Sequence, residues 1–527
     1  MISNPRLPIL LSLFSGLLAT ASFPPGEFYW AAWIALVPFL AALKGASPGR
    51  GFILGFVWGL AHFLSMLYWV VWVLGYYGGI GPILSLVPML LLCLYLSLFP
   101  GFFGAVAAKI NGTPFSALTI SALWVSLEYA RATLLTGFPW CLLGYSQATW
   151  LSIIQVADLT GVYGISFLIV LVNAALAGLM TGGKTKKTFS VVWEPALSAL
   201  FVAGALFYGN MRLSQTDASV DDNTWISVAL IQGNIDQSVK WEKSYQVITL
   251  DKYIRLTHSA LKSGADLVVW PETSVPFFLQ EDTELAKKVL SLAKEAKVAI
   301  VAGSPAYKKV DNKLAYLNRA YIIGPEEGLA AYYDKVHLVP FGEYVPLKKI
   351  LSFVNRLVPA AGDFESGSSI SPVSFGSMSA GIIICFEAIF PEISRKHAEK
   401  GADMLINITN DAWFGKTSAP FQHMIMARFR AVENKLPLLR AANTGISTII
   451  ADTGEIIASG GLFTEDVLTG RVHYSKYPKT FYTRFGDIFT WVLVCFSIIR
   501  VAISLCVGPQ KLDNVVSSES QSERSFA

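Results

Sequence analysis

Eight apolar runs, each about as long as a membrane-spanning helix, constrain this 527-residue chain more than any other feature. The hydrocarbon core of a bilayer is about 30 Å thick, and an α-helix needs about 20 mostly apolar residues to cross it. With 53% hydrophobic and 15% charged residues, the chain is also too apolar for an ordinary soluble enzyme. We therefore predict a membrane protein. The runs lie near residues 7–23, 28–43, 51–74, 82–108, 114–134, 163–181, 191–210 and 487–508.

The apolar runs divide the chain into four parts. Residues 1–211 are predicted to form a membrane domain with seven transmembrane helices, and residues 487–508 are predicted to form an eighth. Residues 212–486 have the mixed composition of a domain that lies outside the bilayer. The tail, residues 509–527, is Ser-rich and is predicted to be a disordered cytoplasmic segment.

Lys and Arg residues in the short loops predict the orientation in the membrane, because cytoplasmic loops carry an excess of positive charge. The N-terminus and every second loop contain such residues, whereas the alternate loops contain none. We therefore expect both termini in the cytoplasm and residues 212–486 on the opposite side of the membrane. The charged positions are Arg6, Lys44, Arg50, Lys109, Lys184, Lys186 and Lys187.

Two features of the helical part have two interpretations each. Arg6 and the apolar stretch that ends in ATASF are also typical of a signal peptide, but a retained helix is favoured because the next apolar run follows almost at once. Glu128 and Arg131 lie three residues apart near the outer end of the fifth run. A pair inside the protein is favoured over contact with a lipid headgroup, because charges within a span usually find partners there.

Short β-rich runs alternate with helical patterns between residues 212 and 486. This order predicts an α/β domain in which helices cover a sheet. In such folds the active groups usually stand at the carboxyl ends of strands, where the backbone leaves the sheet. The predicted strands are 226–235, 265–272, 298–305, 318–324, 380–387 and 402–415, and the predicted helices include 282–297 and 420–435.

Three ionisable residues occur where apolar sequence stops: Glu272 in VVWPETSVPF, Lys335 in YYDKVHLVPFGEYVP and Cys385 in GIIICFEAIF. Each has an ordinary explanation by itself, as a turn-capping acid, a surface charge and a small core residue. Together they offer a thiolate nucleophile, a proton acceptor and a cation for a developing oxyanion. We therefore predict acyl transfer through a thioester on Cys385.

The remaining cysteines, histidines and charges argue against several other functions. Five cysteines show no CxxC spacing and six histidines show no HExxH motif, so no metal site and no cofactor is predicted. Cys385 is the only cysteine between residues 212 and 486, so it has no disulfide partner in that part of the sequence. A net charge of +4 without a basic tract gives no reason to expect nucleic acid as a partner.

The WPE, DKVHLVPFGE and CFE segments resemble the Glu-Lys-Cys triad motifs of the nitrilase superfamily, whose members form covalent thioesters within an α-β-β-α sandwich. With the apolar runs and the segments SFPPGEFYWAAWIALVPFL, GFPWCLLGYSQ, IQGNIDQSVKW and RFRAVENKLPLLRAANTGIS in order, nearly the whole chain resembles the membrane-bound branch, the apolipoprotein N-acyltransferase family. The implied fold class is a multi-span α-helical membrane domain plus an α/β nitrilase-like α-β-β-α sandwich, which would be the catalytic domain.

The resemblance implies a role for each matching residue. Cys385 is implied to be the nucleophile, Glu272 the general base and Lys335 the cation that stabilises the oxyanion. Glu343, eight residues after the lysine, is implied to orient Lys335 or the incoming amine. The family usually has Tyr after the cysteine, so Phe386 contributes ring packing and a backbone N–H but no phenol.

Two further residues are assigned through the resemblance. Trp241 is implied to line the substrate site, and Glu387 is implied to support the nucleophile loop. A packed aromatic residue and a turn-capping acid stay open as alternatives for these two positions.

The implied reaction has two half-reactions in a ping-pong scheme. Cys385 takes an acyl chain from a membrane phospholipid, phosphatidylethanolamine in the family, and releases a lysophospholipid. The α-amine of the N-terminal diacylglyceryl-cysteine of an apolipoprotein then attacks the thioester. We further expect a monomer in the bacterial inner membrane, with both termini cytoplasmic and the catalytic domain periplasmic.

The segment VPLKKILSFVNRLVP, residues 345–359, places five apolar residues along one helical face. An interfacial helix that forms a lipid-facing lid and an ordinary surface helix are both consistent with this pattern. The apolar face consists of Leu347, Ile350, Leu351, Val354 and Leu357.

Two other functions stay open on the residues alone. The first is a membrane-anchored amidase or nitrilase that acts on a small amide, because the triad suits either reaction; the apolar runs favour a lipid substrate. The second is a transporter or lipid-binding scaffold whose outer domain has lost its chemistry. The intact Glu272, Lys335 and Cys385 argue against that loss.

Overall fold

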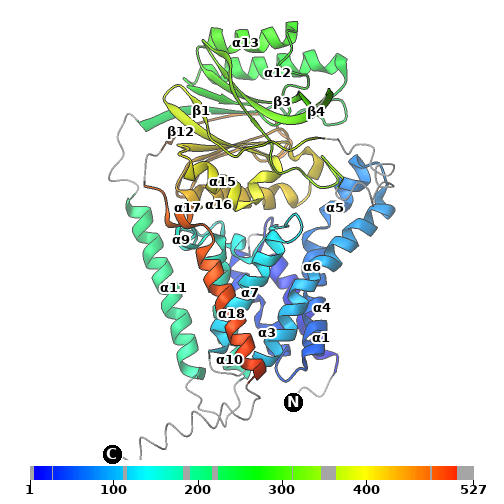
Figure 1. Ribbon diagram of the computed structural model, residues 1–527, viewed down its shortest axis with the longest axis vertical. Coiled ribbons are helices and arrows are strands. Elements are labelled where there is room, and N and C mark those ends of the chain that lie inside the picture. Colours follow the sequence, from blue (N-terminus) through cyan, green and yellow to red (C-terminus); the bar gives the residue numbers. More distant parts are fainter. Residues whose placement is uncertain are drawn as a thin grey trace, which may run out of the picture.

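A helical domain and an α/β domain are stacked along the long axis of the molecule (Figure 1). The computed structural model of the chain describes residues 5–26, 28–110, 115–181, 190–215, 224–310, 312–345, 364–474 and 478–506. The predicted interfacial helix, apart from its first residue, and the predicted disordered tail lie outside these residues.

Each predicted apolar run forms helix within the described part of the chain. Three helices are long and apolar enough to cross a membrane by themselves, and α4 with the bent segment that follows it, at an angle of 49°, is a fourth candidate. The count of eight spans therefore stays a prediction. The helices are α1 (Leu7–Ala21), η1 (Tyr29–Ala31), α2 (Ala32–Ala35), α3 (Val37–Ala42), α4 (Pro48–Met66), α5 (Trp69–Trp72), η2 (Val73–Tyr77), α6 (Pro82–Ile110), α7 (Ser116–Thr133), α10 (Val162–Thr181), α11 (Ser190–Gln215) and α18 (Ile488–Cys506).

The second apolar run forms three short helical pieces where the sequence predicts one helix. Pro38 lacks a backbone N–H and cannot continue the hydrogen bonds of the preceding helix, so it stands in the first turn of α3, after a break at Leu36. The side chain of Asn173 on α10 supplies the lost bonds, because its Oδ1 accepts from Leu36 N at 2.8 Å and its Nδ2 donates to Ala32 O at 2.9 Å. A buried amide thus compensates for the break in the helix.

Helices α4 and α6 approach each other closely. Gly51, Gly55 and Gly59 on α4 face α6, where an added Cβ at any of the three would collide with backbone or Pro100 atoms. Small residues at four-residue spacing allow this kind of close helix contact.

Glu128 and Arg131 are both buried, and their hydrogen bonds run to the loop after α7. Glu128 Oε1 accepts from Leu143 N at 2.8 Å, and Arg131 Nη1 donates to the carbonyls of Phe138 and Trp140 at 3.2 and 3.0 Å. Both side chains therefore stay inside the protein, as predicted, but each bonds to the backbone of the loop that carries Trp140 and not to the other.

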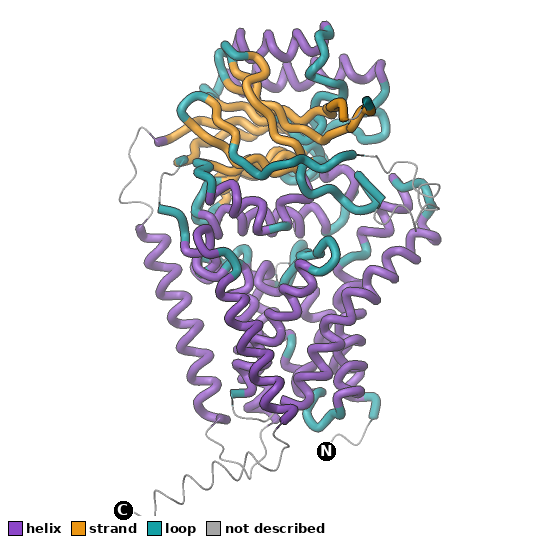
Figure 2. The backbone as a smooth tube through the Cα atoms, in the orientation of Figure 1, coloured by secondary structure: helices purple, strands orange, loops and turns teal. Residues whose placement is uncertain are grey.

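The α/β domain contains two six-stranded sheets between two helical layers, which confirms the predicted α-β-β-α sandwich (Figures 1 and 2). One sheet has the order β12-β1-β2-β3-β4-β5 and the other has the order β11-β10-β9-β8-β7-β6. The first sheet contains β1 (Trp225–Gln232), β2 (Leu267–Val269), β3 (Ala299–Val310), β4 (Lys313–Gly324), β5 (Gly328–Asp334) and β12 (Asp466–His473). The second contains β6 (Val373–Phe375), β7 (Met378–Ile384), β8 (Met404–Thr409), β9 (Leu438–Ala442), β10 (Thr448–Ile450) and β11 (Ile456–Ser459).

Helices α12 (Lys243–Leu261) and α13 (Glu284–Ala296) cover the outer face of the first sheet, and α15 (Pro391–Glu399) and α16 (Ala419–Asn434) cover that of the second. Alternate residues of β7 explain this layering. Ile382 and Ile384 face the core between the sheets, whereas Ile383 packs toward the outer helices. Shorter helical pieces are η3 (Leu143–Gln147), α8 (Leu151–Ile154), α9 (Ala157–Thr160), η5 (Cys385–Ile389), η6 (Asp411–Phe414) and α17 (Phe481–Phe485).

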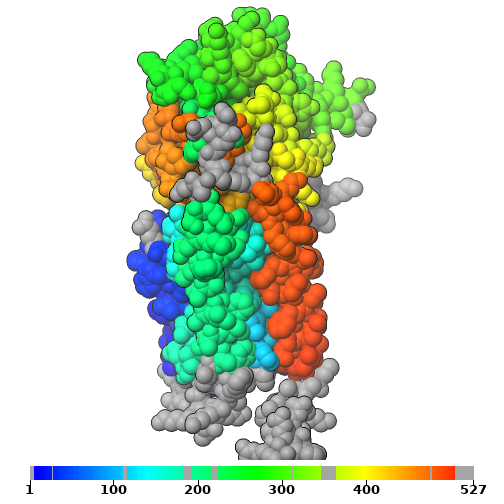
Figure 3. Space-filling model, turned by 90° about the vertical axis from the view of Figure 1, so that its left-hand side faces the viewer, coloured from blue at the N-terminus to red at the C-terminus, as the bar shows by residue number. Residues whose placement is uncertain are grey.

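Helix α16 belongs to both domains. Ala427 and Ala431 pack on the second sheet, whereas Met426 and Phe429 join the apolar cluster of the helical domain. Gln422 on the same helix accepts a hydrogen bond from Trp140 Nε1 at 2.8 Å. Figure 3 shows the stacked domains from the side, with α11 and α18 directly below the α/β domain.

Candidate active site

Cys385 is the first residue after β7 and opens the short helix η5. Its φ of +53° is left-handed, a conformation that is uncommon for a residue with a Cβ and that concentrates at functional sites. Burial and the nearby Glu272 raise the pKa of the Cys385 thiol, and Lys335 opposes this rise. The resting group is therefore a thiol, which needs a proton acceptor before it can act as a nucleophile.

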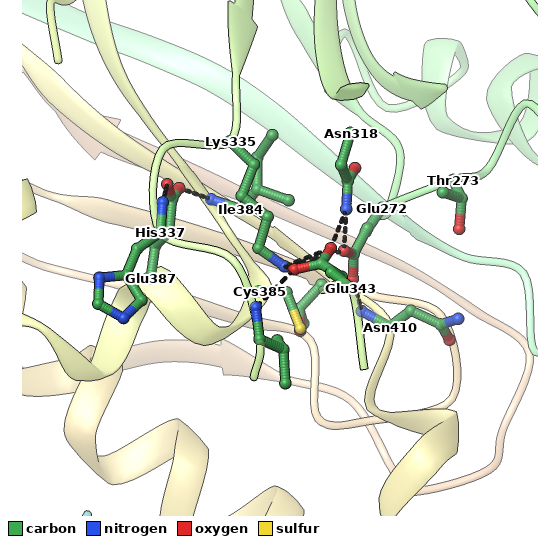
Figure 4. Close-up of polar contacts among 12 residues, drawn as sticks. Glu272, Thr273, Asn318, Lys335, His337, Glu343, Ile384, Cys385, Glu387 and Asn410 are labelled. Carbon is green, nitrogen blue, oxygen red and sulfur yellow. Dashed lines mark hydrogen bonds and ion pairs between the residues drawn. The ribbon is translucent and has the colours of Figure 1, made fainter. Parts of the chain in front are cut away.

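Glu272 follows β2 by three residues and is only 6% exposed. Its Oε2 accepts from Asn410 N at 2.9 Å, and its Oε1 accepts from Asn318 Nδ2 at 2.7 Å. A carboxylate has about four acceptor positions, so this one is held in place and still has room for a proton. Figure 4 shows its carboxylate and the Cys385 thiol in one cluster.

Lys335 is the first residue after β5 and is 1% exposed. Its Nζ lies 2.9 Å from the Glu343 carboxylate and 3.7 Å from Glu272 Oε1. Burial alone would lower the pKa of Lys335, but Glu343 and Glu272 together raise it above its usual value. The side chain is thus a permanent cation beside the thiol, suited to stabilise a developing oxyanion.

Glu343 is the main partner of Lys335. Its Oε2 accepts from Val339 N at 2.8 Å, and its Oε1 accepts from Asn318 Nδ2 at 3.0 Å. The Asn318 amide therefore bridges Glu343 and Glu272 (Figure 4). Sequence reasoning did not select Asn318, although its place at the start of a predicted strand, NRAYIIG, is a polar exception in an apolar run.

Glu387 is fully buried beside the Cys385 turn. Its Oε1 accepts from Val336 N at 2.7 Å, from His337 N at 3.1 Å and from the Tyr333 hydroxyl at 3.1 Å, while its Oε2 accepts from Ile384 N at 2.7 Å. Burial raises the pKa of Glu387 to about 7 against the effect of these N–H donors. The carboxylate joins the turn that carries Cys385 to the loop that carries Lys335.

Phe386 and Trp241 lie at the edges of the site. The Phe386 ring is half-buried, makes an edge contact with Phe390 at 5.3 Å and packs against the apolar cluster of the helical domain. Trp241 is 49% exposed, ahead of α12. Among the described residues, Trp241 lies outside the hydrogen-bonded cluster. Its neighbour Lys240 is the residue that reaches the cluster.

Lys240 is a buried residue of the site that sequence reasoning missed. Its Nζ donates to Thr273 Oγ1 at 2.6 Å and to Glu272 O at 3.3 Å. Burial lowers the pKa of Lys240 to about 8, and the carboxylate of Glu272 opposes that change. Its place in IQGNIDQSVKW was the only signal, since a lysine in a predicted loop is normally solvated.

The cluster brings together a thiol, a proton acceptor and a buried cation, which are the groups needed for acyl transfer through a thioester. Among the described residues, no group of three or more His, Cys, Asp or Glu side chains is arranged to hold a metal ion.

Two family models match this chain. The Carbon-nitrogen hydrolase model matches residues 227–479, and the Apolipoprotein N-acyltransferase N-terminal domain model matches residues 15–175. A carbon-nitrogen hydrolase from Helicobacter pylori G27 aligns with 52% of this chain and 94% of its own, at 18% identity and a TM-score of 0.37. The sequence matches and the sandwich define the class of protein, which is a carbon-nitrogen hydrolase domain joined to a domain of apolar helices.

Full-length relatives identify the family. The apolipoprotein N-acyltransferase of Geobacter metallireducens is 43% identical over 503 residues, which cover 95% of this chain and 96% of the relative. The enzyme of the same name from Pasteurella multocida is 32% identical over 486 residues, which cover 90% and 91%. The chain belongs to the apolipoprotein N-acyltransferase family.

Proposed function

We propose that this protein transfers an acyl chain from a membrane phospholipid to the N-terminal α-amine of a diacylglyceryl-cysteine apolipoprotein, through a thioester on Cys385. The observation that carries the proposal is the buried cluster of Glu272, Lys335 and Glu343 beside the Cys385 thiol. The names of its relatives support the choice of substrates. The α/β domain contacts the apolar helices of the helical domain, and this contact also favours lipid substrates over a small soluble amide.

The first half-reaction forms the thioester. Glu272 takes the proton of the Cys385 thiol, and the sulfur attacks the ester carbonyl of the phospholipid. Lys335 holds the negative charge on the carbonyl oxygen, and Glu343 keeps the lysine in place. The tetrahedral intermediate collapses, the glycerol oxygen leaves with the proton from Glu272, and a lysophospholipid is released.

The second half-reaction forms the amide. The α-amine of the apolipoprotein attacks the thioester carbonyl and gives a proton to Glu272. The C–S bond breaks, and the Cys385 sulfur leaves and takes that proton back. The enzyme returns to its resting state with no net change in its own protons. Glu387 holds the nucleophile loop throughout, and Trp241 and Phe386 line the approach of the substrates.

The apolar runs and the charges of the short loops support one arrangement in the cell. Residues 1–211 and 487–508 would anchor the protein in the bacterial inner membrane, and residues 212–486 would face the periplasm. The donor would be phosphatidylethanolamine-like, and a monomer would contain every group that the two half-reactions use.

Intact-protein mass spectrometry after incubation with phosphatidylethanolamine vesicles tests the proposal. We expect a mass gain of one acyl chain on the wild type, equimolar lysophospholipid, and no gain on Cys385→Ala. Cys495→Ala, which removes an exposed cysteine on α18, is the matched control and should still gain the chain.

Two results would contradict the proposal. Hydrolysis of a small amide without a lipid adduct would indicate an amidase. Lipoprotein maturation supported by Cys385→Ala would indicate a scaffold.

A further inference from the structure

His423 on α16 contacts the backbone of the nucleophile and lies outside the set of residues described above. Its Nε2 lies 3.1 Å from the backbone carbonyl oxygen of Cys385. The ring is fully buried, and neither half-reaction uses it. We propose that His423 is a positioning residue that holds the Cys385 backbone in its left-handed conformation and thereby aims the thiol at Glu272 and Lys335. This inference rests on the proposed function, since it assigns a role within that same reaction.

The imidazole is itself held by charged groups from two other elements. Its Nδ1 lies 3.0 Å from Asp411 Oδ1 on η6 and 3.1 Å from Arg440 Nη2 on β9. Arg440 Nη2 also donates to Asp411 Oδ2 at 2.7 Å, and Thr409 Oγ1 donates to Asp411 Oδ1 at 3.0 Å. These side chains are all completely buried. Hydrogen bonds from several buried groups restrict the motion of the ring.

The position of the proton on His423 follows from its partners. A carbonyl oxygen can only accept, so the hydrogen must be on Nε2. If the ring is charged, Nδ1 donates to Asp411; if the ring is neutral, Nδ1 accepts from Arg440. Burial and Arg440 lower the pKa of His423 while Asp411 opposes them, so the neutral form prevails at neutral pH. Both forms keep the hydrogen bond to Cys385.

The ring has little freedom to turn. Trp140, from the helical domain, stacks on it with ring centroids 6.0 Å apart and an angle of 27° between the planes. Phe414 makes an edge contact at 6.0 Å. The nucleophile turn is therefore braced, through His423, against the helical domain.

The carbonyl contact matters because the Cys385 conformation is unfavourable by itself. A residue with a Cβ avoids positive φ, so it keeps such a conformation only where the surroundings hold it. Without the donor, the peptide after Cys385 loses a hydrogen bond that fixes its orientation, and the sulfur shifts with it. A displacement of about 1 Å at a reacting atom can lower a rate by about 100-fold.

Two near-isosteric variants separate positioning from packing. In His423→Gln, the amide nitrogen replaces Nε2 and can still donate to Cys385. In His423→Asn, the amide replaces Nδ1 and keeps the contacts with Asp411 and Arg440, but it cannot reach Cys385. We expect His423→Asn to slow both Cys385 alkylation by iodoacetamide, read by peptide mass spectrometry, and acyl-enzyme formation by between about 10- and 100-fold. His423→Gln should stay close to wild type in both.

Thermal midpoints of the two variants provide the structural readout. Equal losses in both variants together with equally lowered midpoints would make His423 a packing residue and overturn the proposal, as would wild-type rates in His423→Asn. A third result is possible, in which the two variants show the expected difference in alkylation but the wild type forms no acyl-enzyme. That result would overturn the proposed function and leave the positioning role of His423 intact.

A measurement on the wild type needs no variant to fold. Nitrogen-15 NMR of labelled histidines should show the His423 Nε2 hydrogen retained between about pH 5 and pH 8, where a histidine ordinarily titrates. Loss of that hydrogen within this range would overturn the proposal.

Discussion

Two buried carboxylates, those of Glu387 and Glu272, lie near Cys385, and they differ in their hydrogen-bond partners. Glu387 accepts three backbone N–H groups and one hydroxyl; one donor is the last residue of β7, and the other three lie on β5 and in the loop of Lys335. Glu272 accepts one backbone N–H and one side-chain amide, and it has the ammonium group of Lys335 at 3.7 Å. The two acids have similar burial but different partners.

The hydrogen-bond partners of a buried acid indicate whether it holds the backbone or exchanges a proton. A carboxylate whose oxygens are occupied by backbone donors cannot give up those bonds without moving the backbone, so we expect Glu387 to hold the nucleophile turn in place. A carboxylate held by Asn318 and one N–H keeps an acceptor position free, so Glu272 can take and return a proton.

The largest effect is expected from Glu272→Gln. The amide cannot accept the thiol proton, although its oxygen can still accept from Asn410 N. Acyl-enzyme formation should fall between about 100- and 10,000-fold, the usual range for loss of a general base. Quenched-flow measurement of lysophospholipid release checks this. Glu281→Gln, at an acid outside the cluster, is the control; a rate within a few fold of wild type for Glu272→Gln would assign the base elsewhere.

Glu343→Gln should make acyl-enzyme formation depend on pH in the alkaline range. Glu343 is the first of the carboxylates that raise the pKa of Lys335 against its burial, so its removal lowers that pKa. The lysine must be protonated to stabilise the oxyanion, so the variant should lose activity at alkaline pH where the wild type does not.

A pH profile of acyl-enzyme formation measures this change. Adding Lys335→Arg to Glu343→Gln should remove the new alkaline limb, because arginine stays charged. If the alkaline part of the pH profile were the same in Glu343→Gln as in wild type, Glu343 would not set the protonation of Lys335.

Glu387→Gln should affect stability more than chemistry. One amide N–H would face backbone donors, at a cost of about 1 to 3 kcal/mol. The pKa of Glu387 is about 7 in the folded protein and about 4.3 when unfolded, so the folded state holds the proton longer. This contribution to stability is complete below about pH 4.3 and is lost as the pH rises through about 7.

Thermal midpoints between pH 4 and pH 8 test this expectation. Wild type should lose stability over that window more steeply than Glu387→Gln. If Glu387→Gln lost as much acyl-enzyme formation as Glu272→Gln at an unchanged thermal midpoint, Glu387 would take part in the chemistry and the two acids would not differ in role.

Trp241→Phe should have the smallest effect. The side chain is half exposed, and exposed substitutions usually change stability by less than about 0.5 kcal/mol. We expect a raised KM for the apolipoprotein acceptor with unchanged acyl-enzyme formation. A lowered rate of the first half-reaction would place Trp241 with Glu272 in the reactive cluster.

Local sequence patterns predicted much of this architecture. They failed where contacts with residues distant in the sequence determine the structure of a segment. Long apolar runs became helices, and six β-rich runs became β1, β2, β3, β4, β7 and β8. Strands β5, β6, β9, β10, β11 and β12 were not predicted. Four of them have only three to five residues, which give no readable period, whereas β5 and β12 alternate only partly between buried and exposed residues. The break at Leu36 was missed because the Asn173 amide that stabilises it lies 137 residues away.

The amino-acid sequence by itself determined which residues can carry the chemistry. A thiol, an acid and a lysine at the ends of apolar strands are chemical facts of the chain, and so is its large apolar content. Only the tertiary structure decided which groups surround them. Asn318, Lys240 and His423 reach the site from a strand, a turn and a helix, and a hydrogen bond of about 3 Å has no signature in residues that are tens of positions apart.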